Sequence, residues 1–309
     1  MTDPVFLTYD TIRPHVRWPD AVAAIADGHR RPRAEIKDLF LGPEAGKMMS
    51  RCAYIPGLGY GAKTFTVFAG NAALGQPSVQ GAMTVFDAES GGVRAIVESQ
   101  LVTEVKTAAD SVLGATLLAR PDSEHLLIVG AGVVAQSLIR AYAACLPSLN
   151  TISIWARRPD QAQTAALDAQ IPNVTVRAVE NLAVAAATAD IISSATMAKD
   201  PILKGDWIQP GTHIDLIGAF KSDMREADDA LITKSRLFVD SRDTTIGHIG
   251  ELVIPIAQGT ITESDVLGDF YDMVTGTAAR HNDDDITLFK NGGGAHMDLM
   301  TAQYLMTLA

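Results

Sequence analysis

The stretch "LLIVGAGVVAQ" (residues 126–136) decides the fold of this 309-residue chain. An apolar run is followed by two glycines and an alanine with the spacing G-x-G-x-x-A, at the start of a helical pattern. The first glycine permits a tight turn, the second lets the backbone approach a pyrophosphate, and the alanine lets helix and strand pack closely. The pattern therefore predicts a dinucleotide-binding turn. The residues expected to contact the cofactor here are Gly130, Gly132, Val133, Val134 and Ala135.

The rest of the chain from Glu124 to about Val239 repeats one alternation, in which short β-rich runs are followed by alanine-rich helical patterns. This alternation predicts a Rossmann-type, doubly wound parallel sheet of the α/β class. The expected strands cover 125–129, 151–155, 174–179, 190–195, 213–219 and 236–240, and the expected helices include 133–146 and 159–170.

The flanking residues predict a second domain of the α+β type. The expected elements are a helix at 18–30, β-leaning segments at 49–55, 61–68 and 80–86, and a long helix at 104–119. The tail 289–309 returns to a helical pattern rich in Met and Leu, which would pack back on the N-terminal half. We therefore expect a domain of residues 1–118 plus 291–309, into which a Rossmann-type domain of residues 119–290 is inserted.

The composition argues against several classes of function. The net charge, 25 − 36 = −11, disfavours nucleic acid and anionic membranes as main partners, because phosphate groups need a basic surface. No apolar run reaches the roughly 18 residues of a membrane span, and the N-terminus lacks the pattern of a secretory signal. Cys52, Cys145 and the histidines show neither disulfide nor metal-ligand spacing. We expect a cytoplasmic protein without a metal.

The end of the second strand of such a domain selects between the two nicotinamide cofactors. An acidic residue there binds the ribose 2′-hydroxyl, whereas a basic residue accommodates a 2′-phosphate. This chain has Ala156 at that position, followed by Arg157 and Arg158, and two guanidinium groups suit a phosphate dianion. The pattern favours NADPH. NADH is the alternative if these arginines are only solvated at the start of a helix.

Several segments together resemble the ornithine cyclodeaminase/μ-crystallin family. They are 102–136, 61–63, 213–229, 238–242, 249–253 and 288–302. The resemblance implies a Rossmann domain joined to a substrate-binding domain, which is built from both termini and forms a barrel-like homodimer interface. It also implies hydride transfer between a nicotinamide and the carbon of an amino or imino acid. The further cofactor contacts that we expect are Thr107, Ala195, Thr196, Met197, Gly218 and Asp298.

Candidate substrate contacts follow from the same resemblance. Lys63 matches the family's substrate-domain lysine, whose ammonium could bind the substrate carboxylate or protonate the imine nitrogen. Arg33 and Arg51 are rival matches to the family's carboxylate-binding arginine, and Ser78 matches a hydroxyl position near the substrate. We take Lys63 as the catalytic residue and leave the choice of arginine open.

Two positions depart from the family pattern. Lys106 stands where the family usually has arginine, so the charge is kept but the bidentate fork is lost. Phe220 stands where cyclodeaminases carry an aspartate that handles the side-chain amine of the substrate. A phenyl ring cannot accept a proton, so ornithine cyclodeamination loses its expected base and a more apolar substrate is implied. Asp223 is the alternative base nearby.

These features predict an NADPH-dependent reductase that acts on the C=N bond of a small cyclic or linear imino acid, and reversibly as an amino-acid dehydrogenase. Among the family, the chain is expected to be closer to ketimine reductases than to ornithine cyclodeaminase. Two alternatives stay open. One is a lyase that converts ornithine to proline and ammonia with internally recycled NAD, and the other is a non-catalytic, NADPH-dependent protein that binds a small ligand.

Overall fold

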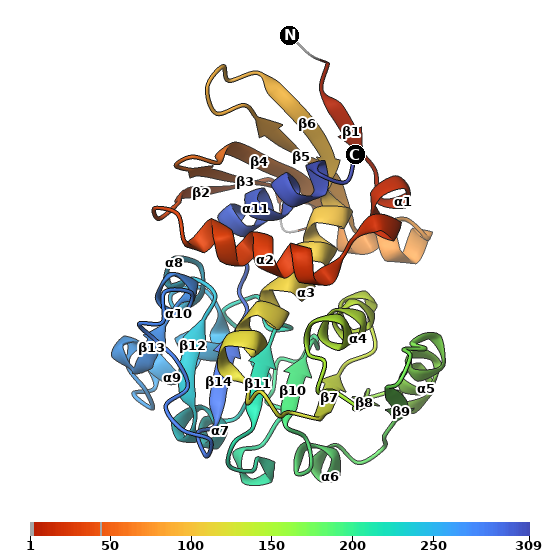
Figure 1. Cartoon of the computed structure of the whole chain (residues 1–309), viewed down its shortest axis with the longest axis vertical. Coiled ribbons are helices and arrows are strands. Elements are labelled where there is room, and N and C mark those ends of the chain that lie inside the picture. The colour runs from red at the N-terminus through yellow and green to blue at the C-terminus, as the bar shows by residue number, and fades with distance from the viewer. Residues whose placement is uncertain (1–2, 44) are drawn as a thin grey trace. The chain divides into compact units, whose positions relative to one another are not determined.

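A computed structural model describes residues 3–43 and 45–309 of the chain. The chain divides into two compact units (Figure 1). The smaller unit comprises Met1–Thr107 and Gly294–Ala309, and the larger unit comprises Ala108–Gly293. The chain thus enters the larger unit once and leaves it once, so the larger unit is an insertion within the smaller one.

The larger unit is built on an eight-stranded sheet in which every neighbouring pair of strands is parallel. The strand order is β13-β12-β14-β11-β10-β7-β8-β9, and Figure 1 shows the strands side by side in this order. The strands are β7 (His125–Val129), β8 (Thr151–Trp155), β9 (Thr175–Ala178), β10 (Ile191–Ser194), β11 (His213–Leu216), β12 (Arg236–Val239), β13 (Val266–Gly268) and β14 (Thr287–Lys290). The predicted Rossmann-type, doubly wound sheet is confirmed.

Helices connect these strands and bury the apolar runs that parallel sheets require. They are α4 (Val133–Cys145), α5 (Pro159–Asp168), α6 (Leu182–Ala186), α7 (Asp229–Lys234), α8 (Arg242–Thr245), α9 (Gly250–Ala257) and α10 (Phe270–Met273). One core includes Leu127, Ile192 and Leu216, whose side chains are fully buried. The order of the sheet reverses between β7 and β10, since β8 and β9 continue on one side and β10 and β11 on the other.

The prediction failed at the centre of this sheet. β14 pairs with both β11 and β12, but the sequence placed its second half at the start of a helical tail. The reason is Lys290, which ends the strand and is completely buried, so that the run lacks a strand's apolar pattern. The helix of the tail begins only at Ala295.

The smaller unit carries a six-stranded sheet of order β1-β6-β5-β4-β3-β2, antiparallel except for the parallel pair of β1 and β6. Its strands are β1 (Val5–Leu7), β2 (Glu35–Leu41), β3 (Lys47–Ile55), β4 (Gly59–Val67), β5 (Val79–Phe86) and β6 (Val93–Glu98). Its helices are α1 (Tyr9–Ile12), α2 (Trp18–His29) and α11 (Ala295–Met306). The predicted strands at 49–55, 61–68 and 80–86 are confirmed within one or two residues, whereas β1, β2 and β6 were not predicted.

Helix α11 returns to the N-terminal half, as its apolar pattern predicted. It packs on α2 and on strands β3 and β4, and Figure 1 shows α2 and α11 side by side. The two helices approach closely at Gly28, where an added Cβ would collide with the side chain of Met300. This packing places residues near 296–300 beside the middle of a sheet formed much earlier in the chain.

The helix that enters the larger unit is longer than predicted. α3 covers Ser99–Leu118, whereas the sequence suggested a start at residue 104. The boundary between the two units falls inside this helix, between Thr107 and Ala108. The sequence placed the domain boundary at the end of the helix.

Across the described residues, no helix is long and apolar enough to cross a membrane.

Candidate active site

The turn after β7 has the geometry that the glycine spacing predicted. Gly130 has a φ of +125°, and a Cβ there would lie 2.8 Å from the carbonyl oxygen of Ala195. Gly132 has open space where a Cβ would stand, and no described side chain caps α4 at this residue. The peptide N–H groups at the start of α4 can therefore meet an anion. Ala135 is buried, as close packing of helix and strand requires.

The next strand places two arginines at the same edge of the sheet. β8 ends at Trp155, Ala156 is buried, and the exposed Arg157 and Arg158 precede α5. Because β7 and β8 are parallel neighbours, their carboxyl ends lie at one edge. The residues present therefore fit a dinucleotide whose pyrophosphate lies at α4 and whose adenosine ribose lies toward β8.

The loops after β10 and β11 meet at Gly218. A Cβ at this residue would collide with the backbone of Thr196, so only glycine permits the approach. Met197 and Phe220 are exposed on these loops, with 73% and 53% of their surface accessible. The structure thus brings together four predicted cofactor residues. They are Gly130, Ala195, Thr196 and Gly218.

A buried glutamate joins the same two loops. Glu226 accepts hydrogen bonds at Oε1 from the Ser194 hydroxyl (2.7 Å) and from the amide (2.9 Å) and hydroxyl (2.8 Å) of Thr196. At Oε2 it accepts from the amides of Gly218 (2.6 Å) and Ala219 (3.3 Å). Sequence reasoning missed Glu226. The sequence feature that could have pointed to Glu226 is an acidic residue in "MREAD" (224–228), shortly after the predicted strand at 213–219.

The backbone of Glu226 is held in turn by Glu251 on α9. Glu251 accepts the amides of Glu226 (2.8 Å) and Ala227 (3.0 Å). Burial, together with the nearby charge of Glu226, raises the pKa of Glu251 to about 7, although Lys290 opposes this shift. The Lys290 ammonium donates to the carbonyls of Leu216 (2.7 Å) and Asn291 (3.0 Å). The charges of Glu226 and Glu251 also act on this ammonium and oppose the lowering of its pKa by burial, so a cation lies near these buried carboxylates.

In the smaller unit, Lys63 on β4 is the centre of the candidate site. Its side chain is buried, and Nζ donates to Asp298 Oδ1 over 2.7 Å and to the Thr103 hydroxyl over 3.3 Å. Burial lowers the pKa of Lys63; Asp298 opposes this effect, and the charges of Lys106 and Arg51 add to it. The ammonium therefore releases its proton more readily than an ordinary lysine does.

Other cations gather around this lysine. Arg51 lies opposite Lys63 in the β3–β4 register, and its Nε donates to Asp38 over 3.0 Å. The buried His296 on α11 is influenced by several of the same positive charges. Burial lowers its pKa well below the ordinary value, and the charges of His29, Arg51, Lys106 and Arg33 lower it further. Both rival arginines therefore lie within electrostatic reach of one place on α11. This cluster of positive charge suits a carboxylate.

The remaining predicted residues lie as follows. Asp298 was assigned to the cofactor, and here it is the hydrogen-bond partner of Lys63. Ser78 precedes β5, and its carbonyl accepts the amide of Phe68; none of the described contacts links its hydroxyl to Lys63. Thr107 is buried at the end of the smaller unit. Asp223 forms an exposed ion pair with Lys199, which lowers its pKa and weakens it as a base.

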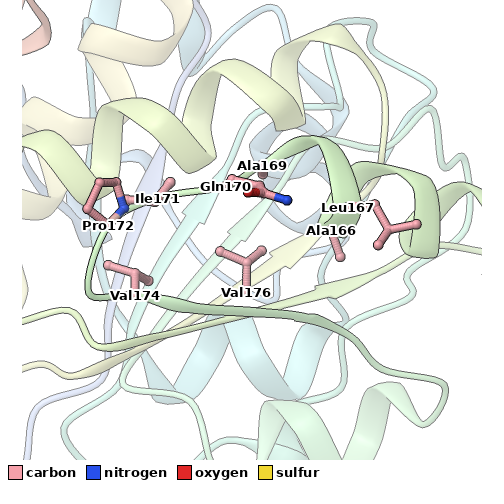
Figure 2. Close-up of a pocket in the computed structure, with 8 residues that line it drawn as sticks. All are labelled: Ala166, Leu167, Ala169, Gln170, Ile171, Pro172, Val174 and Val176. Atoms are coloured by element: carbon pink, nitrogen blue, oxygen red, sulfur yellow. The ribbon is translucent and has the colours of Figure 1, made fainter.

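One hollow of the surface lies outside this arrangement. It encloses about 650 Å³ beside α5 and β9, and Figure 2 shows the eight residues that line it. They are Ala166, Leu167, Ala169, Gln170, Ile171, Pro172, Val174 and Val176. These residues carry no charge and include no predicted site residue, so the hollow is not part of the candidate site. Within the described ranges, no group of three or more potential ligands could hold a metal.

Comparison with known proteins adds a family and close relatives. The model of the ornithine cyclodeaminase/mu-crystallin family matches residues 35–307. The chain is 61% identical over 303 residues to Delta(1)-pyrroline-2-carboxylate reductase of Paracoccus denitrificans, covering 98% of this chain and 96% of the relative. It is 32% identical over 241 residues to ketimine reductase mu-crystallin of Mus musculus, covering 78% and 73%.

A solved structure is similar over nearly the whole chain. It is the Delta(1)-pyrroline-2-carboxylate reductase of Thermococcus litoralis in complex with NADH and L-proline. The TM-score is 0.92 and the identity is 26%, with 99% of this chain and 97% of that chain covered.

Proposed function

Because the chain belongs to the ornithine cyclodeaminase/mu-crystallin family, we propose that it is an NAD(P)H-dependent reductase of small imino acids, with Δ1-pyrroline-2-carboxylate as its substrate. The observation that carries this proposal is the buried Lys63–Asp298 pair within a group of cations. The 61% identity to a reductase of this name supports the choice of substrate.

Substrate binding falls to the smaller unit. Arg33, Arg51 and Lys106 are the proposed sources of positive charge for the carboxylate, because the charge of each lowers the pKa of the buried His296. Lys106 is buried, so its ionic contact would be stronger than it would be in water, whereas Arg51 is half-buried and Arg33 is exposed. The same unit would hold the imine nitrogen near Lys63.

Proton transfer falls to Lys63. A bound reduced nicotinamide supplies the hydride that adds to the imine carbon. The π electrons of the C=N bond move to nitrogen, which takes a proton from the Lys63 ammonium. The lowered pKa of Lys63 makes this transfer easier, while Asp298 keeps enough of the ammonium charged to donate.

Phe220 favours net reduction over cyclodeamination. The lyase alternative needs a base for the side-chain amine of ornithine, and Phe220 stands at that position. Asp223 is a poor replacement, because it is exposed and paired with Lys199. The cofactor is then consumed as a reductant and is not regenerated within one turnover.

The larger unit serves the cofactor, and Arg157 and Arg158 favour NADPH over NADH. Their exposed guanidinium groups follow β8, where the 2′-phosphate would lie. The solved relative was crystallised with NADH, so both cofactors belong in the assay.

The smaller unit is also proposed to form a homodimer. Several large apolar side chains of this unit are exposed, and a second copy would cover them. They are Leu39, Phe40, Leu41, Phe68, Leu74 and Val79. Sedimentation of the wild type and of F40E would test the proposal. A dimer that dissociates in the variant is expected, whereas a monomeric wild type would contradict it.

Two free cysteines, Cys52 and Cys145, support a cytoplasmic setting.

The enzymatic test follows absorbance of the reduced nicotinamide with Δ1-pyrroline-2-carboxylate and with linear ketimines. Stoichiometric oxidation of NADPH and formation of proline are expected, and K63Q should lose most of this activity. No oxidation with any imino acid would sink the proposal. Proline and ammonia from ornithine with only catalytic NAD would support the lyase instead. Tight ligand binding without any turnover would support the non-catalytic alternative.

A further inference from the structure

The buried carboxylate of Glu226 is surrounded by hydrogen-bond donors. Its carboxylate accepts five hydrogen bonds, three at Oε1 and two at Oε2, while its side chain is completely excluded from solvent. Three of the five donors are backbone amides, which cannot reverse their polarity. The site is therefore built for an acceptor with two oxygens, which is a carboxylate.

The donors lie at the carboxyl end of one strand and on the loops that follow this strand and its neighbour. Ser194 ends β10, Thr196 lies two residues beyond, and Gly218 and Ala219 follow β11. β10 and β11 pair in parallel with no change of register. One carboxylate thus links the two loops, and they approach so closely that a Cβ at Gly218 would collide with the Thr196 backbone.

The topology of the sheet assigns these loops to one half of the cofactor. Pyrophosphate binds at the start of α4 after β7, and the adenosine half lies toward β8, where Arg157 stands. On the other side of the reversal point lie β10 and β11. The nicotinamide half of the dinucleotide must therefore lie over the loops that Glu226 joins.

We propose that Glu226 is a positioning residue, which holds the loops at 195–197 and 218–220 as a fixed surface for the nicotinamide half of the cofactor. This inference rests on the proposed function only in that the cofactor is a nicotinamide dinucleotide. The Thr196 hydroxyl donates its proton to Glu226, which fixes its orientation within the loop. Glu251 supports the arrangement from behind by holding the backbone of Glu226.

The test separates the two halves of the cofactor. In E226Q, the amide NH2 must face at least one backbone N–H, so one loop loses its anchor. We expect the Kd of NADPH to rise about tenfold or more, since hydrogen bonds to a charged group are lost. 2′-Phospho-ADP-ribose lacks the nicotinamide half, and its Kd should stay within about twofold of the wild-type value. Both constants come from quenching of tryptophan fluorescence, without turnover.

Two further variants make the result decisive. D228N is the matched control, because Asp228 lies two residues away and accepts the amides of Gly205 and Leu231, which are not on these loops. It should change neither constant. E226D keeps the charge with a shorter reach and should give an intermediate Kd for NADPH, which also serves if E226Q does not fold. Parallel loss of both ligands, or loss of neither, would overturn the assignment. Failure of imino-acid reduction would instead count against the proposed function alone.

Discussion

Lys63 Nζ lies 2.7 Å from Asp298 Oδ1, and both side chains are buried in the smaller unit. The carboxylate opposes the burial that lowers the pKa of Lys63. In D298N this opposition is lost, so the pKa of Lys63 should fall further. A proton donor works below its own pKa, so the alkaline limb of kcat/KM should move to lower pH and kcat should fall about tenfold or more. If D298N instead weakens NADPH binding and leaves the pH profile in place, Asp298 belongs to the cofactor, as the sequence alone suggested.

The two arginines can be separated by their effect on substrate binding. R51Q and R33Q should each raise the KM for the imino acid about tenfold to a hundredfold, because a charge-assisted contact to the carboxylate is lost. The KM for NADPH should not change. D38N is the control for R51Q, since it removes the ion-pair partner of Arg51 and leaves the guanidinium in place. A wild-type KM in either arginine variant would remove that arginine from the site.

Cofactor preference should follow the arginines after β8. The double variant R157A/R158A should raise the KM for NADPH about tenfold or more and leave the KM for NADH nearly unchanged. Steady-state assays with both cofactors measure this. R140A removes an exposed arginine of α4 and should change neither value. Equal changes for the two cofactors would mean that these arginines do not read the 2′-phosphate.

Two glycines should respond differently to the same added methyl group. Gly132 has open space for a Cβ, so G132A should keep the wild-type melting temperature and yet weaken NADPH binding about tenfold by blocking the approach of the pyrophosphate. Gly218 has none, so G218A should lower the free energy of unfolding by about 3 kcal/mol. Thermal melting and NADPH titration of both variants check this pair. A destabilised G132A would show that its turn is tighter than the structure shows.

Asp215 should make the stability of the larger unit depend on pH. Burial raises its pKa to about 7, although hydroxyl groups of Ser193, Ser111 and Tyr142 donate to it. The pKa of Asp215 is higher in the folded protein than in the unfolded chain. Its contribution to the free energy of unfolding is therefore complete below the unfolded pKa of 3.8 and is lost as the pH rises through the folded pKa of about 7. The loss amounts to about 1.4 kcal/mol for each pH unit in that range.

D215N has no charge to bury at this position. As the pH rises from about 4 to about 7, its free energy of unfolding should therefore increase relative to that of the wild type. Urea denaturation across this range measures the difference. The hydroxyl groups can rotate to suit the amide, so the variant should fold. Parallel curves for the two proteins would contradict the raised pKa of Asp215.

Much of the larger unit could be predicted from sequence, because its strands are continuous apolar runs that end at recognisable turns. β7 and β8 have the predicted bounds, and Gly130 has the positive φ that its motif requires. β14 could not be predicted, because its buried Lys290 is compatible with a strand only when the carbonyls of Leu216 and Asn291 accept from it. That acceptance depends on tertiary structure.

The candidate site shows the same division. Lys63 and the arginines could be proposed from motifs, but the partner of Lys63 could not, because Asp298 lies 235 positions further along the chain. Glu226 was missed for a related reason. Its five donors come from the end of β10 and from two loops that only the sheet brings together. Sequence patterns identify groups that carry chemistry more readily than the groups that hold them in place.

The return of α11 has a consequence for biosynthesis. This helix is translated after every other element of its own unit and after the whole larger unit, yet it supplies Asp298 and packs on α2, β3 and β4. Domains fold largely as units during translation. The larger unit can therefore complete its sheet while the smaller unit still lacks α11. Until α11 is synthesised, the Lys63 ammonium lacks the carboxylate of Asp298. In a nascent chain, the cofactor-binding fold therefore forms before the Lys63–Asp298 pair. The proton donor is complete only when α11, the last helix of the smaller unit, has been synthesised.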